Sequence, residues 1–480
     1  MVLFEVKKNI EHPGEFTYDL RALAQSFYPE LACQILEIGE WAEDEGYPVK
    51  CSVDSDVILD EKLPAGYTKN SVKAVVYQAF ARKTEKVLPW GILTGIRPAK
   101  IPLQMFLNGK GKQEVFETLC KEYLLVDAKA QLALDVALKE YELIKDYEHT
   151  QGYNLYIGIP FCPSICQYCS FSSYDYITYK DKVESYLAAL EKELIYVAKR
   201  AKEENKKLHT IYVGGGTPTS LNEQQLKRLM DMIHCHLPVN DEVEFTVEAG
   251  RPDSINREKL QILKDADVSR ISINPQTMKQ HTLDLLGRRH SVEQVKEVFY
   301  LAREVGFDNI NMDLIVGLPE EDEVDFAKTM MQIHELDPDS VTVHTLVIKR
   351  ASRMRREQME QHADMYPEDT LIPVLQRASG EMLRDYGYEP YYMYRQKNKA
   401  GTSRNTNQEN VAYAKPGREC LYNIFIMEEL ETIVALGSGA STKYVIHGEN
   451  RMERIENVKS VDDYISRIDE MIERKEKLWR

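Results

Sequence analysis

The sequence predicts an α/β protein: a partial (β/α)6 barrel of the TIM type, flanked by an N-terminal α/β domain and a C-terminal α+β region. Between Tyr153 and Val347, short β-type runs alternate with helical patterns, which indicates βαβ units and a parallel sheet. Six such units can be counted, fewer than the eight that close a full barrel. The chain has 480 residues, whereas an ordinary domain has about 150. We therefore expect an accessory domain over 1–150, the barrel over 151–350 and a third region over 351–480.

Two helical patterns support the N-terminal domain. Ser71 is suited to cap a helix whose apolar face includes Val76 and Phe80. Asp127 is suited to cap a second helix, with Val136 on its apolar side. The polar stretch KDYEHTQGYN follows this helix and marks the expected boundary.

The barrel strands are expected in the runs LYIGI, HTIYVGG, EFTVEA, RISINP, NINMDLIVG and SVTVHTLV. Helical patterns such as EQQLKRLMDMI and VDFAKTMMQIH separate them. Ligands of such barrels bind at the C-terminal ends of the strands, so the chemistry is expected there. The C-terminal region contains EPYYMYRQKN, the Gly-rich ALGSGAST and a charged terminal helix, and we expect it to cover the open side of the barrel.

The composition narrows the classes of function. Hydrophobic residues make up 43% and charged residues 29%, as in soluble globular proteins. A net charge of −16 argues against nucleic-acid binding, which requires a basic face. The N-terminus lacks an apolar leader, no run is long enough to span a membrane, and eight cysteines are too few for a disulfide framework. These features predict a reduced, cytoplasmic protein.

Three cysteines, Cys162, Cys166 and Cys169, follow the first barrel strand with C-x3-C-x2-C spacing in YIGIPFCPSICQYCSF. A structural zinc site takes four ligands in paired elements, and no second pair occurs here. A chance grouping of buried cysteines is the other alternative. A [4Fe–4S] cluster normally takes four thiolates, so three would leave one iron open to a small molecule. An open position is typical of catalytic rather than structural metal sites.

This motif resembles the radical S-adenosylmethionine (SAM) enzymes, and more narrowly their HemN-like group. The segments YIGIPFC, VGGGTPT, VEAGRPD, RISINPQT, LLGRRH and NMDLIVGLPEE occur in that group's order and near its spacing. The resemblance implies a [4Fe–4S] cluster held by the three cysteines, with SAM on the fourth iron. One electron from the cluster then splits SAM into methionine and a 5′-deoxyadenosyl radical.

The resemblance also implies the residues that hold SAM. It places Tyr168 as an aromatic wall of the pocket and brings the backbone near Val347 against the cofactor. The remaining implied contacts are Tyr156, Gly215, Gly216, Thr217, Glu248, Gln276, Arg288 and Asp313. Glycines let backbone approach a ligand closely, and an arginine can bind a carboxylate through two hydrogen bonds. No side-chain acid or base is required, because the cofactor carries the difficult step.

The segments LPWGILTGIRPAKI and MYRQKN are most similar to the HemZ branch of this group. The resemblance implies an oxidoreductase of haem biosynthesis, a coproporphyrinogen dehydrogenase that converts two propionates to vinyl groups. Its implied partners are a tetrapyrrole substrate and a one-electron donor such as flavodoxin or ferredoxin. In the established dehydrogenases the motif continues Cys-x-Cys, whereas this chain has Phe171. Two alternatives therefore stay open: haem or porphyrin trafficking without turnover, as in HemW, and a radical methyl transfer or haem-degrading reaction.

A tetrapyrrole with four carboxylates requires local cations in this acidic chain. The run KRASRMRREQ, over 349–358, supplies the densest group just past the sixth strand. Further candidates are Arg97 and Lys100 in GIRPAK, and Arg395 and Lys397 beside the tyrosines.

Overall fold

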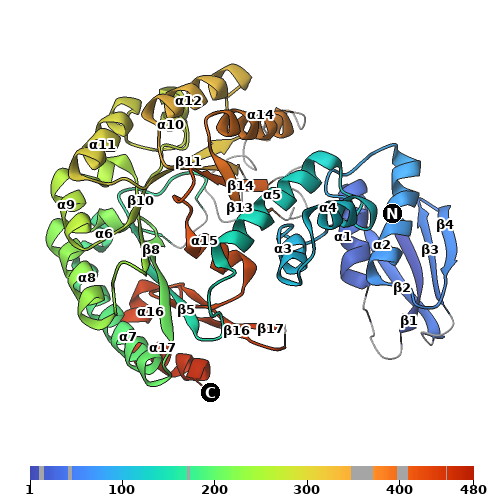
Figure 1. The fold of residues 1–480 in the computed structure, drawn as a ribbon, viewed down its shortest axis with the longest axis horizontal. Helices are drawn as coiled ribbons and strands as arrows, with labels where there is room; N and C mark the ends of the chain where they lie inside the picture. The colour runs from blue at the N-terminus through green and yellow to red at the C-terminus, as the bar shows by residue number, and fades with distance from the viewer. Residues whose placement is uncertain are drawn as a thin grey trace. The chain divides into compact units, whose positions relative to one another are not determined.

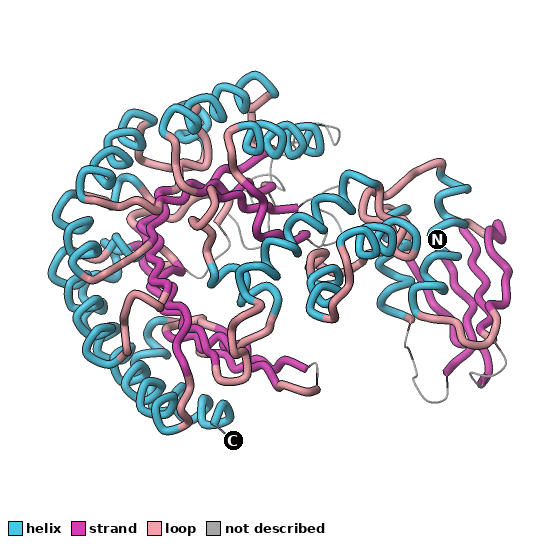
Figure 2. The backbone as a smooth tube through the Cα atoms, viewed as in Figure 1, coloured by secondary structure: helices cyan, strands magenta, loops and turns pink. Residues whose placement is uncertain are grey.

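The computed structural model describes residues 1–9, 14, 16–41, 46–169, 173–346, 371–396, 409–449 and 451–479. Figures 1 and 2 trace the chain by position and by secondary structure. Contacts divide the chain into two compact units. Unit 1 contains Met1–Glu142 and Met393–Glu409, and unit 2 contains Leu143–Tyr392 and Asn410–Arg480.

Unit 1 contains a four-stranded sheet in the order β2-β1-β3-β4, with β1 and β2 parallel and the other pairs antiparallel. Its core joins the inner sheet face to α1 and α2 through fully buried side chains such as Phe4 and Phe80. The elements are β1 (Val2–Asn9), α1 (Thr17–Phe27), β2 (Cys33–Trp41), β3 (Tyr47–Val53), β4 (Asp56–Leu63), α2 (Lys69–Thr84), α3 (Lys100–Leu107), α4 (Lys112–Lys121) and α5 (Asp127–Ile144), whose last turn passes into unit 2.

The first helix expected in this unit begins one turn earlier than the sequence suggested. Thr68, not Ser71, is the N-cap of α2, and its side chain accepts a hydrogen bond from the Ser71 amide. The Ser71 hydroxyl in turn accepts from the Thr68 amide at 2.8 Å. This reciprocal pair is a capping box, in which the third helical residue can be mistaken for the cap.

Arg395, which the sequence suggested as a contact for the carboxylates of a tetrapyrrole, lies in unit 1 and packs against other residues of that unit. Its guanidinium lies 5.4 Å from the ring centroid of the fully buried Trp90 and donates to the Leu93 carbonyl. The indole nitrogen of Trp90 donates to Glu409 at 2.8 Å, and Lys129 pairs with the same carboxylate. Burial lowers the pKa of Arg395 to about 10, against the opposing effect of Glu409. Arg395 therefore packs inside this unit and is not exposed for an anionic ligand.

Unit 2 is built on the expected six parallel strands, which follow one another in the sheet as β5-β8-β9-β10-β11-β12. The sheet curves, and the helices that connect its strands cover the outer face (Figures 1 and 2). The strands are β5 (Gly152–Ile159), β8 (Lys207–Gly215), β9 (Glu244–Gly250), β10 (Arg270–Ile273), β11 (Ile310–Val316) and β12 (Ser340–Thr345). The helices between them are α6 (Tyr176–Tyr179), α7 (Val183–Glu203), α8 (Glu223–His236), α9 (Arg257–Asp265), α10 (Gln280–Leu285), α11 (Val292–Val305) and α12 (Glu323–Leu336), and a short pair, β6 (Phe161–Cys162) and β7 (Tyr174–Asp175), follows β5.

Alternation along these strands separates an apolar outer face from a polar inner one. On β10, Ile271 and Ile273 are fully buried, whereas Arg270 donates to the Ser340 hydroxyl of β12 at 3.2 Å. The same hydroxyl donates to the side chain of Asn311 on β11 at 3.0 Å. Hydrogen bonds therefore connect the inner-face side chains of β10, β11 and β12.

The C-terminal region does more than cover the open side. It extends the sheet at both edges, with β14 antiparallel to β12 and β15 parallel to β5. These strands pair backbone groups that an open barrel would leave exposed at its edges. Helix α15 lies inside the curve of the sheet, and its first amides, Leu421 and Tyr422, donate to Glu244 of β9 at 2.6 and 3.1 Å. The remaining elements are α14 (Leu371–Asp385), β13 (Glu389–Arg395), β14 (Glu409–Ala414), α15 (Leu421–Glu428), β15 (Thr432–Leu436), β16 (Ser441–Ile446), β17 (Arg451–Glu456), α16 (Val461–Ser466) and α17 (Ile468–Arg474).

A buried polar cluster fixes the end of the chain to the barrel. The Lys475 ammonium and the Glu193 carboxylate of α7 are fully buried and lie 2.5 Å apart. Glu193 also accepts from Tyr464 at 2.5 Å, from the Asn457 side chain at 2.8 Å and from the Gly437 amide at 3.0 Å. Across the described parts of the chain, every helix is too short or too polar to cross a lipid bilayer.

Candidate functional site

The three predicted cysteines lie together on the segment that leaves β5 at its C-terminal end. Cys162 and Cys166 are buried, Cys169 is partly exposed, and all three are free thiols. The Cys169 amide donates to the Cys166 carbonyl at 3.2 Å, which closes a tight turn. Tyr168, between the last two cysteines, packs on an apolar cluster that includes Leu286. The cysteine segment is therefore held by the loop that follows α10.

The grouping of these thiols is electrostatically unfavourable without a cation. The pKa of Cys162 is raised to about 11, mainly by burial, with a hydrogen bond from Thr217 opposing the rise and the nearby Cys169 and Cys166 adding to it. A metal centre relieves this repulsion, because thiolates are its ligands. Among the described residues, no three such side chains surround one point as the ligands of a single ion would. A cubane differs, since each thiolate binds its own iron.

The glycines at the end of β8 leave the room that the cysteine segment occupies. A side chain at Gly216 would place its Cβ 2.6 Å from the Phe161 carbonyl and 3.0 Å from the Cys162 sulfur. Gly215 has a φ of +110°, a conformation that side chains disfavour. The amides of Gly216 and Thr217 donate to the carbonyls of Ile159 and Phe161, both at 2.8 Å. The predicted Gly-rich contact region thus lies directly against the predicted cluster ligands.

Two acidic side chains lie on β9 and β11, the strands on either side of β10. Glu248 accepts a hydrogen bond from the Tyr212 hydroxyl at 2.6 Å, and Asp313 accepts from the Asn311 side chain at 2.8 Å. Burial raises the pKa of Glu248 to about 7, with the Tyr212 hydrogen bond opposing it and the nearby Asp313 charge adding to it. Burial also acts to raise the pKa of Asp313, but interactions with His344 and Asn311 outweigh it and lower that pKa. Of these two carboxylates, Glu248 is therefore the one that changes charge near neutral pH.

The shifted pKa of Glu248 predicts a pH-dependent stability. A folded-state pKa above the usual 4.5 means that the carboxylate form is disfavoured in the fold, so stability is lost as pH rises through about 7. We expect the free energy of unfolding of the metal-free protein, relative to Glu248→Gln, to fall by roughly 2 kcal/mol between pH 5 and pH 8.5. Urea unfolding of both proteins at these two pH values measures this difference. A constant difference would contradict it.

Gln276 and Arg288 follow β10, before and after α10 respectively. Gln276 has a φ of +69°, a strained conformation fixed by backbone hydrogen bonds with Asp313 and Ile315, both 2.9 Å. Arg288 is buried and donates to the Tyr168 hydroxyl at 3.0 Å and to the Asn274 carbonyl at 2.6 Å. Its Nε has no hydrogen-bond partner within the described residues. The guanidinium thus has donor capacity left for an anion.

Tyr156 belongs to a group of three tyrosines that the sequence did not reveal as a group. Its ring lies 6.3 Å from those of Tyr212 and Tyr422, and these two stack at 4.4 Å with an interplanar angle of 22°. Tyr212 precedes the glycines by two residues, so strand alternation alone could have placed it on the inner face. Tyr422 is separated from Tyr212 by over 200 residues, and no local pattern connects them.

Some predicted residues lie outside the described part of the chain. They are Val347, Phe171, Lys397 and the basic residues Lys349, Arg350, Arg353, Arg355 and Arg356. The structure leaves their roles as sequence-based expectations.

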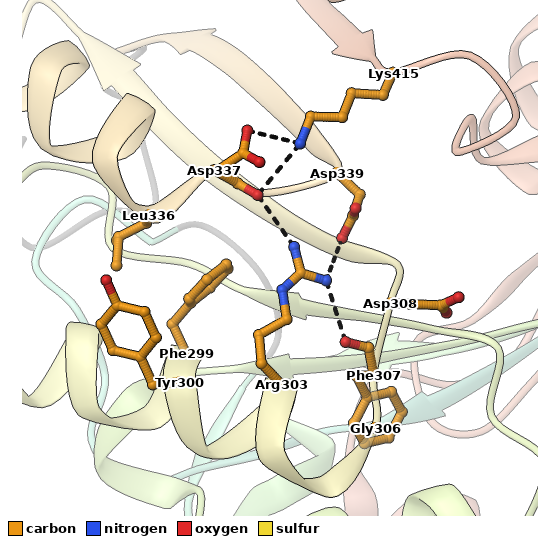
Figure 3. A pocket seen from close by; sticks show the side chains of 10 residues that line it. All are labelled: Phe299, Tyr300, Arg303, Gly306, Phe307, Asp308, Leu336, Asp337, Asp339 and Lys415. Carbon is orange, nitrogen blue, oxygen red and sulfur yellow. Dashed lines mark hydrogen bonds and ion pairs between the residues drawn. The ribbon is translucent and has the colours of Figure 1, made fainter.

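A surface cavity of about 500 Å³ lies away from this site (Figure 3). It is bordered by Arg303 and Lys415, whose charges are paired with Asp339 and Asp337 at 2.7 Å each. Asp337 and Asp339 directly precede β12, so the cavity is at the opposite strand ends from the cysteines. We do not assign it to the candidate site.

Comparisons with known proteins identify the family and the fold. Residues 156–333 match the family model of the radical SAM superfamily. The chain is 38% identical over 419 residues to the oxygen-independent coproporphyrinogen-III oxidase-like protein HemZ of Bacillus subtilis, covering 87% of this chain and 82% of that protein. It is 42% identical over 221 residues to the heme chaperone HemW of the same organism, covering 44% of this chain and 57% of HemW. The solved structure of coproporphyrinogen III oxidase HemN from Escherichia coli has the same fold, with a TM-score of 0.54 and 23% identity over 70% of this chain and 73% of HemN.

Proposed function

Because the chain belongs to the radical SAM superfamily, in the HemZ branch of its HemN-like group, we propose that it is an enzyme acting on a tetrapyrrole. The proposed reaction is the oxygen-independent decarboxylation of two coproporphyrinogen III propionates to vinyl groups, which gives protoporphyrinogen IX. The family works with a [4Fe–4S] cluster and SAM. The observation that carries the proposal is the set of three free thiols, buried or half-buried, on the short segment that follows β5, the first of which, Cys162, lies beside Gly216.

In this proposal, Cys162, Cys166 and Cys169 hold the cluster and leave one iron for SAM. The residues fit that group, since the Cys162 sulfur lies against Gly216, where a Cβ would intrude, and the free thiols of Cys166 and Cys169 follow on the same short segment. When bound, the cluster and SAM would supply a carbon radical that takes one hydrogen atom from each propionate side chain, and the side chain would then lose CO2 and pass one electron to a one-electron acceptor as the vinyl group forms. The protein excludes water and orients the two partners, so no side-chain acid or base is needed.

The polar residues at the strand ends are proposed to bind SAM. Arg288 presents free donor capacity to the SAM carboxylate. Glu248, Gln276 and Asp313 offer acceptors to its ribose hydroxyls or ammonium. Tyr156, Tyr168, Gly215, Gly216 and Thr217 border the same edge, and the backbone near Val347 is the remaining proposed contact.

We propose the substrate-binding residues and the electron donor from the charges that the substrate and the cluster require. The basic run over 349–358 is the candidate that binds the propionates, and a flavodoxin or ferredoxin is the candidate electron donor. Free thiols at all eight cysteines suit a reducing cytoplasm.

One anaerobic assay tests the reaction. The reconstituted protein is given SAM, a reductant and coproporphyrinogen III, and products are followed by mass spectrometry. Two successive losses of CO2, each with two hydrogens, are expected, together with methionine and 5′-deoxyadenosine. SAM cleavage without any change in the porphyrinogen would contradict the proposed substrate.

The second candidate function is haem binding without turnover. The 42% identity to a heme chaperone over 221 residues favours it. In the same assay, stoichiometric haem binding with no SAM consumed would support this function and overturn the first. SAM-dependent loss of added haem would instead indicate a haem-degrading reaction.

A further inference from the structure

We infer that Arg251 is a positioning residue of the iron–sulfur cluster: it anchors the cysteine segment and donates a charged hydrogen bond to the Cys166 sulfur. The inference rests on the proposed assignment of Cys166 as a cluster ligand. It concerns a residue in VEAGRPD that no SAM contact accounts for.

The contacts of Arg251 divide between the cysteine segment and one carboxylate. Its Nη1 lies 2.9 Å from the Ser164 carbonyl, 2.7 Å from the Ser164 hydroxyl and 3.6 Å from the Cys166 sulfur. On its other side, Nε and Nη2 donate to the two Asp253 oxygens at 2.9 and 2.6 Å. This two-point pairing fixes the plane of the guanidinium.

Because Arg251 is buried, its positive charge interacts strongly with the Cys166 sulfur. Arg251 is 4% exposed, and the Asp253 side chain is 15% exposed. Charges interact more strongly where water is excluded, so a cation touching a ligand sulfur stabilises added negative charge on that ligand. Hydrogen bonds to cluster sulfurs are among the protein features that set the reduction potential. Arg251 therefore favours the one-electron reduced cluster.

A second donor reaches a different cysteine. The hydroxyl of Thr217, 2% exposed, lies 3.6 Å from the Cys162 sulfur. Thr217 and Arg251 come from adjacent strands, after β8 and β9 respectively, so each of these two strand ends supplies one donor to the proposed cluster. Thr217 is neutral, whereas Arg251 carries a full charge, and hydrogen bonds from charged donors are roughly twice as strong.

A purely structural role for Arg251 makes a different prediction. An arginine that only held its loop would affect folding and leave the potential of a retained cluster unchanged. Arg303 provides the matched control, because it also pairs with one aspartate, Asp339 at 2.7 Å, and donates to two backbone carbonyls at 3.1 Å, but contacts no cysteine.

The test compares Arg251→Met, Arg251→Lys, Asp253→Asn and Arg303→Met with the wild-type protein after anaerobic reconstitution. Circular dichroism checks folding, and iron and sulfide are counted per chain. The midpoint potential is measured by dithionite titration, in which one electron enters the cluster, followed by electron paramagnetic resonance. For Arg251→Met we expect at least a tenfold weaker reduction equilibrium, a midpoint about 59 mV more negative. Arg251→Lys keeps the charge and should shift less, and Arg303→Met should match the wild type.

Loss of the cluster from a folded Arg251→Met protein would also support the inference. A full cluster with the wild-type potential would overturn it. If Arg251→Met does not fold, the potentials of Arg251→Lys and Asp253→Asn test the inference instead. Wild-type potentials in both variants would overturn the inference. A wild-type protein that takes up no cluster would overturn the proposed cysteine assignment itself, and this inference with it.

Discussion

Replacing Cys166 with alanine is expected to abolish the iron–sulfur cluster and every SAM-dependent activity. The variant removes one of the three proposed thiolate ligands, and two cannot hold a cubane that already lacks a fourth protein ligand. Iron and sulfide per chain should fall to the background level, the visible absorbance of the reconstituted protein should disappear, and no 5′-deoxyadenosine should form. The loss is expected to be complete because nothing among the described neighbours replaces the sulfur.

The matched control is Cys235→Ala. Cys235 is an exposed thiol on α8 and is remote in sequence from the cysteine motif. This variant should retain iron, sulfide and SAM cleavage at wild-type levels. A Cys166→Ala protein that keeps a full cluster would remove Cys166 from the ligand set. A Cys235→Ala protein that loses it would show that thiol chemistry during reconstitution, rather than ligation, governs the result.

The sequence predicted the barrel because its signals are local. Each strand of the barrel is a short apolar run, and each helix has its own periodic face, so six βαβ units could be counted without a structure. The three cysteines are close in sequence and therefore had to be close in space. Gly215 and Glu248 are at the ends of adjacent strands, and the parallel sheet brings such ends to one edge.

What the sequence could not predict depends on pairing between distant segments. Strand β15 lies beside β5 although about 270 residues separate them. Local sequence patterns do not predict pairing between segments so far apart in the chain. Arg395 packs on Trp90 for the same reason, which is why a basic residue beside tyrosines was taken for a ligand contact. Arg251 was missed because its functional partners, Ser164 and Cys166, lie on another strand's loop.

The Lys475–Glu193 pair is the largest non-local contribution to stability that we expect. Both side chains are fully buried, and they are 282 residues apart in the chain. Breaking a buried ion pair leaves an uncompensated charge in a medium of low dielectric constant, which typically costs about 3 to 5 kcal/mol. Lys475→Met removes the cation and keeps most of the side-chain volume. The Glu193 carboxylate then retains only neutral donors from Tyr464, Asn457 and Gly437.

We therefore expect Lys475→Met to lower the free energy of unfolding by about 3 kcal/mol or more in urea titrations followed by circular dichroism. Lys182→Met is the control, because Lys182 pairs with Asp462 on the surface, and exposed pairs contribute about 1 kcal/mol or less. The double variant Glu193→Gln with Lys475→Met should recover part of the loss, since no charge remains buried. A Lys475→Met effect no larger than that of Lys182→Met would contradict this account.

Lys475→Met should also weaken binding of the proposed iron–sulfur cluster, because hydrogen bonds connect the buried Lys475–Glu193 pair to the strand that precedes Cys162. Glu193 accepts from Gly437, the neighbouring Ser438 amide donates to the Tyr186 hydroxyl at 3.1 Å, and that hydroxyl donates to the Gly158 carbonyl at 2.6 Å. Gly158 is the second-to-last residue of β5, the strand that leads into Cys162. We expect folded Lys475→Met protein to retain iron less well than the double variant does, measured as iron per chain after gel filtration. Equal retention in the two proteins would show that the end of the chain stabilises the fold without supporting the site.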